Sequence, residues 1–299
     1  MSPAMHALKG LGVAMVTPFQ PDGKVDFPAL QRLVDHLHGG GVDFLVVLGT
    51  TAETATLSVE ERRRVLDFVL EVNAGRLPVV AGVTGNNTEA LCDEMAQWDW
   101  NGLAACLSAT PAYNKPNQEG LIRHFEHVAE AAGAPVMLYN VPGRTGSNMS
   151  ASTTLELSKH ANVCGIKEAS GDLVQIAEIL RGRPEGFMVW SGDDALAMPT
   201  MAMGADGVIS VLGNALPKRM ADMVHQTGFG QVTEASKTHL NLVPLVDLLF
   251  AEGNPAGIKM AMHHLGLCGP DVRLPLVAAS EGLRDRLYSA LASLDVQTI

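Results

Sequence analysis

The chain has 299 residues, of which 47% are hydrophobic and 18% charged, and its formal net charge at neutral pH is −11. An acidic chain without a run of Lys and Arg lacks the basic face that a nucleic-acid backbone requires, so we expect a small-molecule ligand and no nucleic-acid partner. The high apolar content excludes a largely disordered chain and is enough for one large buried core.

The first ten residues, MSPAMHALKG, lack the apolar stretch of a secretory signal, and no window of roughly 18 uncharged apolar residues predicts a membrane span. The cysteines, at positions 92, 106, 164 and 268, form no C-x-x-C pair, so we expect free thiols and a reducing compartment. These features together predict a cytoplasmic protein that contacts no membrane.

Short apolar runs rich in β-branched residues recur at fairly even spacing along the first two thirds of the chain. Stretches with helical periodicity lie between them, for example around Leu30 and Leu37. Strand and helix therefore alternate eight times, and the predicted strand segments are Gly12–Pro18, Asp43–Thr51, Pro78–Val83, Ala105–Pro111, Pro135–Pro142, Val163–Ser170, Phe187–Asp194 and Gly207–Val211.

These runs are apolar almost throughout, which indicates strands of a parallel sheet covered on both faces. Eight such βα units close most readily into an α/β (β/α)₈ TIM barrel. A doubly wound open sheet is the alternative, but the loop after the first run, Thr17–Gln20, lacks a G-x-G-x-x-G fingerprint. The spacing of Ser58 and Glu61 predicts a capping box at the start of the second helix.

Beyond Val211 the pattern changes, because the residues from about Pro217 to Ala292 carry only helical periodicity. We therefore expect residues 1–216 to form the barrel. Residues 217–299 would supply the eighth barrel helix and a C-terminal helical extension, packed with the barrel as one structural unit.

Lys167 is the sharpest candidate for chemistry, because it follows an apolar run that should point partly into a dry barrel, near the strand end where barrel enzymes place reactive groups. Burial lowers the pKa of a lysine and frees its amine to attack a carbonyl. From position alone, a structural ion pair with Glu168 or another nearby carboxylate is an equally good interpretation.

Tyr113 and Tyr139, two of the three tyrosines, fall at strand ends, where a phenol bonded to another hydroxyl can relay protons. Thr50 or Thr51, at the end of the second run, could supply that hydroxyl. The alternatives are that the tyrosines only cap strands and that the threonines only satisfy backbone groups.

Arg144 lies in a tight turn after the fifth run, where its guanidinium could hold a carboxylate with two hydrogen bonds, or could instead pair with an acidic surface loop. The histidines at 124 and 127 and the aspartates at 193 and 194 lack the spacing or the further ligands of a metal site. We therefore predict no metal site.

Three ordered segments, 49–53 (GTTAE), 139–146 (YNVPGRTG) and 165–170 (GIKEAS), resemble the signatures of the dihydrodipicolinate synthase and N-acetylneuraminate lyase family. The resemblance spans roughly residues 8–290 and includes the segments 191–194, 207–211, 253–256 and 273–276. The segment that contains Arg144 resembles that of the synthase branch of the family, whereas sialate lyases usually lack this arginine. The family commonly has a glycine in place of Ala52 and an aromatic residue in place of Ala112.

This resemblance implies condensation of pyruvate with L-aspartate 4-semialdehyde in lysine biosynthesis, without a cofactor. It implies that Lys167 forms a Schiff base with pyruvate, and that Tyr139, Thr50 and Tyr113 relay protons. The implied substrate-binding residues are Thr51 for the pyruvate carboxylate, Arg144 for the semialdehyde, and Gly192 and Ile209 at the pyruvate end.

The resemblance also implies a homotetramer built from two tight dimers, with Tyr113 reaching into the partner's site. Two rival functions remain: a pyruvate lyase of the same family acting on sialic acid or a 2-keto-3-deoxy sugar acid, and a non-catalytic barrel that senses a 2-oxo acid. Relatives inhibited by lysine hold it at the tight-dimer interface. Because Val59, Arg62 and Ala112 stand at the corresponding positions here, we expect insensitivity to lysine even though Asn86 is retained.

Overall fold

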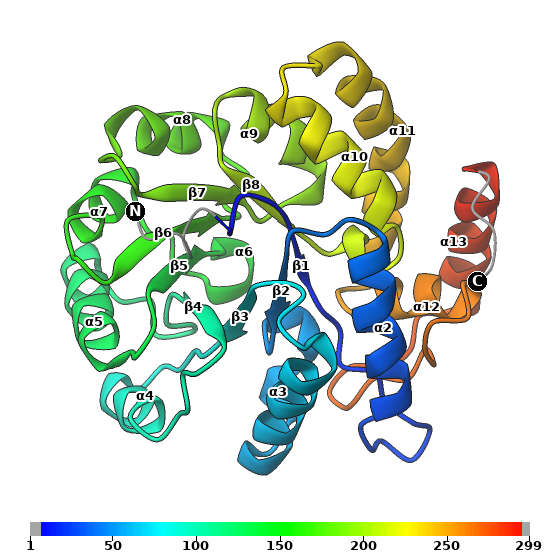
Figure 1. Ribbon diagram of the computed structural model, residues 1–299, viewed down its shortest axis with the longest axis horizontal. Helices are drawn as coiled ribbons and strands as arrows, with labels where there is room; N and C mark the ends of the chain where they lie inside the picture. Colours follow the sequence, from blue (N-terminus) through cyan, green and yellow to red (C-terminus); the bar gives the residue numbers. More distant parts are fainter. Residues whose placement is uncertain (1–6, 295–299) are drawn as a thin grey trace.

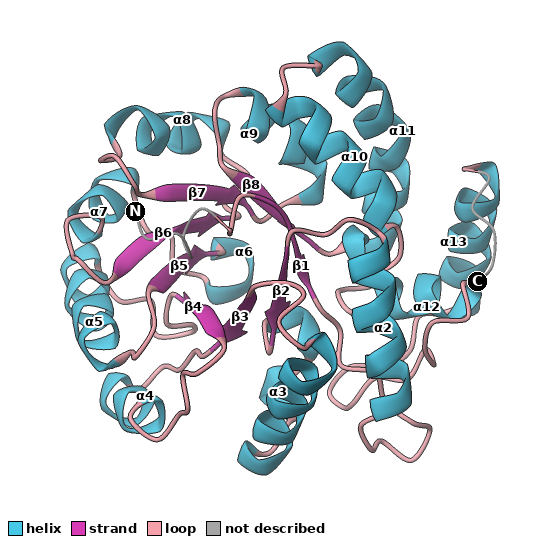
Figure 2. Ribbon diagram, in the orientation of Figure 1, coloured by secondary structure: helices cyan, strands magenta, loops and turns pink. Residues whose placement is uncertain are grey.

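A closed parallel barrel occupies the centre of the computed structural model, which describes residues 7–294 (Figures 1 and 2). Within those residues each strand pairs with the next along the chain and β8 pairs with β1. This closure confirms the predicted TIM barrel and excludes the doubly wound open sheet. The strands are β1 (Gly10–Ala14), β2 (Phe44–Val47), β3 (Val79–Gly82), β4 (Leu103–Ala109), β5 (Val136–Asn140), β6 (Val163–Glu168), β7 (Met188–Ser191) and β8 (Gly207–Ser210).

Helices surround the barrel and cover its outer face (Figure 2). Helix α3 begins with the predicted capping box: the Ser58 hydroxyl accepts from the Glu61 N–H at 3.1 Å, and the Glu61 carboxylate accepts from the Ser58 N–H at 3.0 Å. The surrounding helices are α2 (Phe27–Gly39), α3 (Val59–Asn73), α4 (Thr88–Met95), α5 (Gln118–Ala131), α7 (Ala151–Leu157), α8 (Leu173–Gly182), α9 (Ala197–Ala202) and α10 (Pro217–Gly228).

The described residues after α10 form α11 (Val232–Phe250), α12 (Ala256–His264) and α13 (Glu281–Ser293). These helices lie together on one side of the barrel (Figure 1). Shorter helical segments sit in the loops that follow the strands: η1 (Thr50–Ala52), η2 (Thr54–Thr56), α6 (Pro142–Thr145), η3 (Asp194–Leu196) and η4 (Leu212–Asn214).

All eight predicted strand segments extend beyond the C-terminal ends of the observed strands. The segment Asp43–Thr51, for example, ends as a strand at Val47, and the segment Gly12–Pro18 begins earlier, at Gly10, and ends at Ala14. The residues beyond β1 remain buried although they are not in the sheet. Apolar character reports burial and not strand pairing, so it continues into the loops that fold over the barrel mouth.

Side chains alternate between the barrel interior and the layer beneath the helices. In β5, Met137 and Tyr139 belong to the interior cluster, whereas Val136 and Leu138 pack outward under the helices. Trp190, Phe44 and residues from the other strands fill the interior below the mouth. The barrel is therefore a packed core, and only side chains near the strand ends can reach a ligand.

Candidate active site

Lys167 and Tyr139 lie side by side near the C-terminal ends of neighbouring strands. They are aligned partners in the β5–β6 pairing, and Lys167 Nζ is 4.4 Å from the centre of the Tyr139 ring. Glu168, the next residue, has the opposite orientation, and its carboxylate accepts from Ser170 N–H at 2.7 Å and from Gln175 at 3.1 Å. Within residues 7–294 Lys167 forms no ion pair, so the alternative of a pair with Glu168 is not realised.

The position of Lys167 favours the neutral amine. Burial lowers the pKa of Lys167 to about 8; Asp194 opposes this shift and Arg144 reinforces it. Gly192 leaves room for the lysine stem, since a Cβ at that position would lie 2.9 Å from Lys167 Cε. A buried lysine with a lowered pKa beside a cavity is the arrangement that amine nucleophiles require.

Asp194 holds the loops after β7 and β8 together. Its side chain is buried, and one carboxylate oxygen accepts from the N–H groups of Val211 at 2.9 Å and Leu212 at 2.8 Å. Asp193 accepts from the Ala195 N–H at 2.9 Å and so caps η3. Both aspartates therefore make hydrogen bonds that hold the loops near Lys167 in place.

A cavity of about 440 Å³ opens above Lys167 at the barrel mouth. Thr51 and Tyr139 are buried in its wall, whereas Thr50 and Arg144 are exposed at its rim. Burial raises the pKa of Tyr139 to about 12, against the charge of Arg144 and a side-chain hydrogen bond with Thr50, so the phenol keeps its proton at neutral pH. The cavity is lined by Thr50, Thr51, Tyr139, Val141, Arg144, Lys167, Ala169, Gly192, Asp193, Ala195, Val211, Val246, Asp247, Phe250, Ala251 and Asn254.

Two residues from the sequence prediction do not line this cavity. Ile209 is 1% exposed and belongs to the interior cluster. Tyr113 is 91% exposed, has a positive φ of 73°, and donates its N–H to the Thr145 carbonyl at 3.0 Å. A single chain therefore brings together Lys167, Tyr139 and their neighbours but leaves Tyr113 on the surface.

Sequence reasoning missed the contacts that hold the Thr50–Glu53 turn. Asn254 donates its side-chain N–H to the Thr51 hydroxyl oxygen at 2.9 Å, and Lys259 forms a buried ion pair with Glu53 at 2.6 Å. Arg273 donates its backbone N–H to Glu53 at 2.8 Å. A lysine inside the otherwise apolar stretch 256–262 is the signal that could have predicted such a pair.

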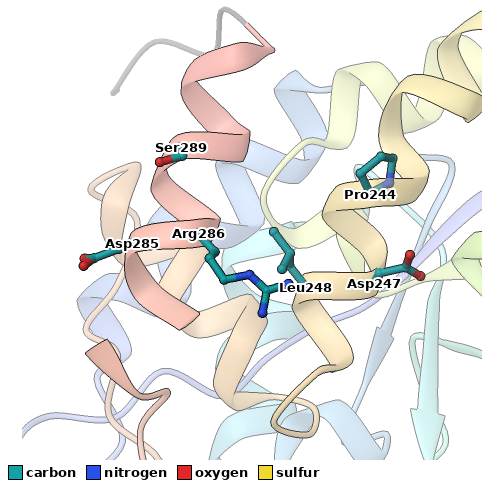
Figure 3. A pocket seen from close by; sticks show the side chains of 6 residues that line it. All are labelled: Pro244, Asp247, Leu248, Asp285, Arg286 and Ser289. Carbon is teal, nitrogen blue, oxygen red and sulfur yellow. The ribbon is translucent and has the colours of Figure 1, made fainter. Parts of the chain in front are cut away.

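A second hollow, of about 590 Å³, lies between α11 and α13 and is lined by six residues (Figure 3). Figure 3 shows Arg286 pointing toward Leu248, whereas Asp247 points away from Arg286. Its lining residues include none of the buried titratable groups around Lys167. The cavity over Lys167 is therefore the better candidate for chemistry.

Among the described residues, no group of three or more His, Cys, Asp and Glu side chains is placed to hold a metal ion. None of the described helices combines the length and the apolar character needed to span a bilayer.

Known proteins resemble this chain over nearly its whole length. It is 48% identical over 284 residues to the 4-hydroxy-tetrahydrodipicolinate synthase of Flavobacterium psychrophilum, which covers 95% of this chain and 97% of that protein. The Acinetobacter baumannii dihydrodipicolinate synthase in complex with pyruvate is 37% identical, with a TM-score of 0.94 and coverage of 97% and 100%. A monomeric dihydrodipicolinate synthase variant is also 37% identical, with a TM-score of 0.95 and coverage of 98% and 99%.

The family model for the dihydrodipicolinate synthetase family matches residues 7–294, which are all the residues that the structure describes. The match covers the barrel and the C-terminal helices alike. The chain therefore belongs to the dihydrodipicolinate synthetase family.

Proposed function

We propose that this chain is a lyase with 4-hydroxy-tetrahydrodipicolinate synthase activity, which condenses pyruvate with L-aspartate 4-semialdehyde on the diaminopimelate route to lysine. The observation that carries the proposal is the buried Lys167, which has no ion-pair partner within residues 7–294 and lies beside Tyr139 at a cavity with Arg144 on its rim. Relatives that cover nearly the whole chain bear the same activity in their names.

The first half of the reaction needs a neutral amine in a dry site. Lys167 attacks the carbonyl carbon of pyruvate, a C–N bond forms, and water leaves to give an iminium ion. The Thr51 hydroxyl donates a hydrogen bond to the pyruvate carboxylate. Gly192 lies against the lysine stem, and Ile209 closes the apolar interior beneath the pyruvate end.

Proton transfer then has to occur first at a carbon and afterwards at an oxygen. Loss of a proton from the pyruvate methyl group gives an enamine, whose carbon attacks the aldehyde of the second substrate. The Tyr139 phenol, which is protonated at neutral pH, gives a proton to the new alkoxide oxygen, with Thr50 beside it to pass protons outward. Arg144 holds the carboxylate of the semialdehyde with two parallel hydrogen bonds.

The amino group of the second substrate completes the cycle. It attacks the iminium carbon, a second C–N bond forms, and the bond to Lys167 breaks. The products are a six-membered ring and the free Lys167 amine. These reaction steps use only side chains of the protein and the two substrates.

A rival within the family is a lyase for sialic acid or a 2-keto-3-deoxy sugar acid. Arg144 favours the synthase, because its guanidinium suits a carboxylate better than the hydroxyls of a sugar chain. A non-catalytic 2-oxo-acid sensor would not need a neutral lysine. Turnover of pyruvate with L-aspartate 4-semialdehyde, compared with the aldehydes of the rival reactions, tests the proposal. Of the aldehydes supplied together with pyruvate, we expect only the semialdehyde to be turned over. Preferred turnover of a sugar aldehyde would overturn the proposal.

We also propose a homotetramer of tight dimers, in which Tyr113 enters the partner's site. Its exposure of 91% and its positive φ support this assignment, because a large aromatic side chain held outward at a cost in backbone energy suits a contact surface. Mixing inactive Tyr113→Phe and Lys167→Ala subunits should restore some active sites. Mixed dimers without any recovered activity would contradict the proposal, as would a monomer with full activity.

A further inference from the structure

The segment between α11 and α12 reaches into the candidate active site. Asn254, within that segment, lines the cavity over Lys167 and also the adjoining cavity at the loop after β2. Its side chain is 6% exposed, and its amide nitrogen donates to the Thr51 hydroxyl oxygen at 2.9 Å. A residue of the C-terminal helical extension thus contacts the threonine that would bind pyruvate.

One further contact holds this segment against the loop, and a second holds it against α11. The buried Lys259, in α12, pairs with Glu53 at 2.6 Å, two residues beyond Thr51. Helix α12 packs closely on α11, because a Cβ at Gly257 would lie 2.3 Å from the Leu249 carbonyl oxygen. The ion pair and the helix packing therefore both support the placement of Asn254 beside Thr51.

The direction of this hydrogen bond has a chemical consequence. A threonine hydroxyl has one hydrogen to donate and accepts through its oxygen. Since the Thr51 oxygen accepts from Asn254, its hydrogen is left for another acceptor, and within residues 7–294 the Thr51 hydroxyl donates to no protein group. A carboxylate in the cavity is an acceptor of the required kind.

We propose that Asn254 is a positioning residue for pyruvate, which orients the Thr51 hydroxyl so that it donates to the substrate carboxylate. The inference rests on the proposed function, because it assumes that pyruvate binds over Lys167. It assigns a role to the segment Gly253–Ala256, which resembles the family's pattern but has no role in the mechanism above. It also makes the C-terminal extension part of the pyruvate site.

Substitution of Asn254 by alanine and by aspartate tests this direction. Asn254→Ala removes the donor and should raise the pyruvate KM about tenfold. Asn254→Asp keeps the shape but accepts the Thr51 hydrogen and places a negative charge beside the substrate carboxylate, so the increase should reach about a hundredfold. The KM for the semialdehyde should change less than about twofold in both variants.

A purely structural role predicts the reverse order, because the isosteric aspartate would then be the milder change. That order would overturn the proposal, as would equal effects on both substrates. Should Asn254→Ala fail to fold, Asn254→Asp still decides the question through its pyruvate KM. Asn162, whose side chain donates to the Ala129 carbonyl at 2.8 Å before β6 begins, supplies a matched control, and Asn162→Asp should leave the pyruvate KM unchanged.

Borohydride trapping of the pyruvate imine separates this inference from the proposed function, since it needs no second substrate. Absence of an imine in the unmodified protein would overturn the proposed function. An imine that forms at the same pyruvate concentrations in both Asn254 variants would overturn only the role of Asn254. In a Thr51→Val background, which lacks the hydroxyl, Asn254→Ala should have no further effect on pyruvate binding, and additive effects would contradict the coupling.

Discussion

Two lysines are buried among residues 7–294, and their surroundings differ in one decisive respect. Lys259 is 0% exposed and pairs with Glu53 at 2.6 Å, donates to the Asp271 carbonyl at 2.8 Å, and lies 4.1 Å from the centre of the Phe19 ring. Lys167 is 5% exposed and has no such carboxylate partner among residues 7–294. Burial is therefore common to both lysines, and the carboxylate partner of Lys259 is what distinguishes them.

The two lysines also differ in how many structural elements their contacts hold together. Three elements meet at the ion pair of Lys259: the loop that carries Thr50 and Thr51, helix α12, and the segment at Arg273. Loss of this ion pair should therefore destabilise the contacts between all three. Around Lys167 the neighbours are a glycine, an aromatic ring and Asp194, one of whose carboxylate oxygens accepts from two backbone N–H groups. The contacts of Lys259 hold the loop of the site in place, and the surroundings of Lys167 suit the role that we propose for its amine.

The largest expected effect separates the two lysines chemically. Borohydride reduction in the presence of pyruvate should attach one pyruvyl group, and peptide mapping should place it on Lys167 and not on Lys259. Lys167→Ala should lower turnover by about 10³-fold or more, because the covalent step is lost. A label on Lys259, or an active preparation without a label, would contradict the comparison.

Lys259→Met should mainly affect stability. It leaves the Glu53 carboxylate buried without its partner, so the free energy of unfolding should fall by about 3–5 kcal/mol, measured by urea denaturation. Adding Glu53→Gln should recover part of that loss. If the Lys259→Met protein kept its full stability but formed no pyruvate imine, Lys259 would have a chemical role.

Arg144→Ala should separate binding of the second substrate from imine formation. Loss of the bidentate contact should raise the activation free energy of turnover by about 1.5–3 kcal/mol, while borohydride trapping of pyruvate remains nearly intact. The pKa of Lys167 should rise, because the nearby positive charge that lowers it is removed. Equal damage to trapping and turnover would mean that Arg144 has a structural role.

The rate of imine formation should follow the ionisation of Lys167. Only the neutral amine attacks, and burial lowers its pKa from 10.5 to about 8. The rate should therefore rise about tenfold per pH unit below pH 8 and level off above it. A rise that continues to about pH 10, as for an exposed lysine, would refute the effect of burial. Rapid-quench trapping over a pH series measures it.

The smallest expected effect is that of free lysine as an inhibitor. A bound lysine needs a carboxylate, as Glu53 provides for Lys259, but the groove at Val59 presents Arg62, whose guanidinium already pairs with Glu94 at 2.7 Å. The Asn86 side-chain oxygen accepts from the Ala112 N–H at 2.8 Å, so it is occupied too. Initial rates should not change with millimolar lysine, and clear inhibition would mean that another carboxylate, such as Asp93, holds it.

Much of the fold and of the site follows from the sequence by itself. Apolar periodicity predicts the repeated βα units and hence the barrel, because burial on both faces leaves a direct trace in the residue types of each strand. The helix start at Ser58 has a local signature and is correct. Lys167, Tyr139, Thr50, Thr51 and Arg144 could be proposed for the site because they follow apolar runs at strand ends.

Only the tertiary structure shows that Lys167 and Glu168 do not form the ion pair that their adjacency in sequence suggests. The residues that neighbour it in sequence suggested Glu168 as a partner, but consecutive residues of a strand face opposite sides, and Glu168 bonds to Ser170 and Gln175. The same applies to Asn254 and Lys259, which contact Thr51 and Glu53 across separations of 203 and 206 residues. Contacts at such separations leave no local pattern, because they depend on how the closed barrel and the C-terminal helices come together.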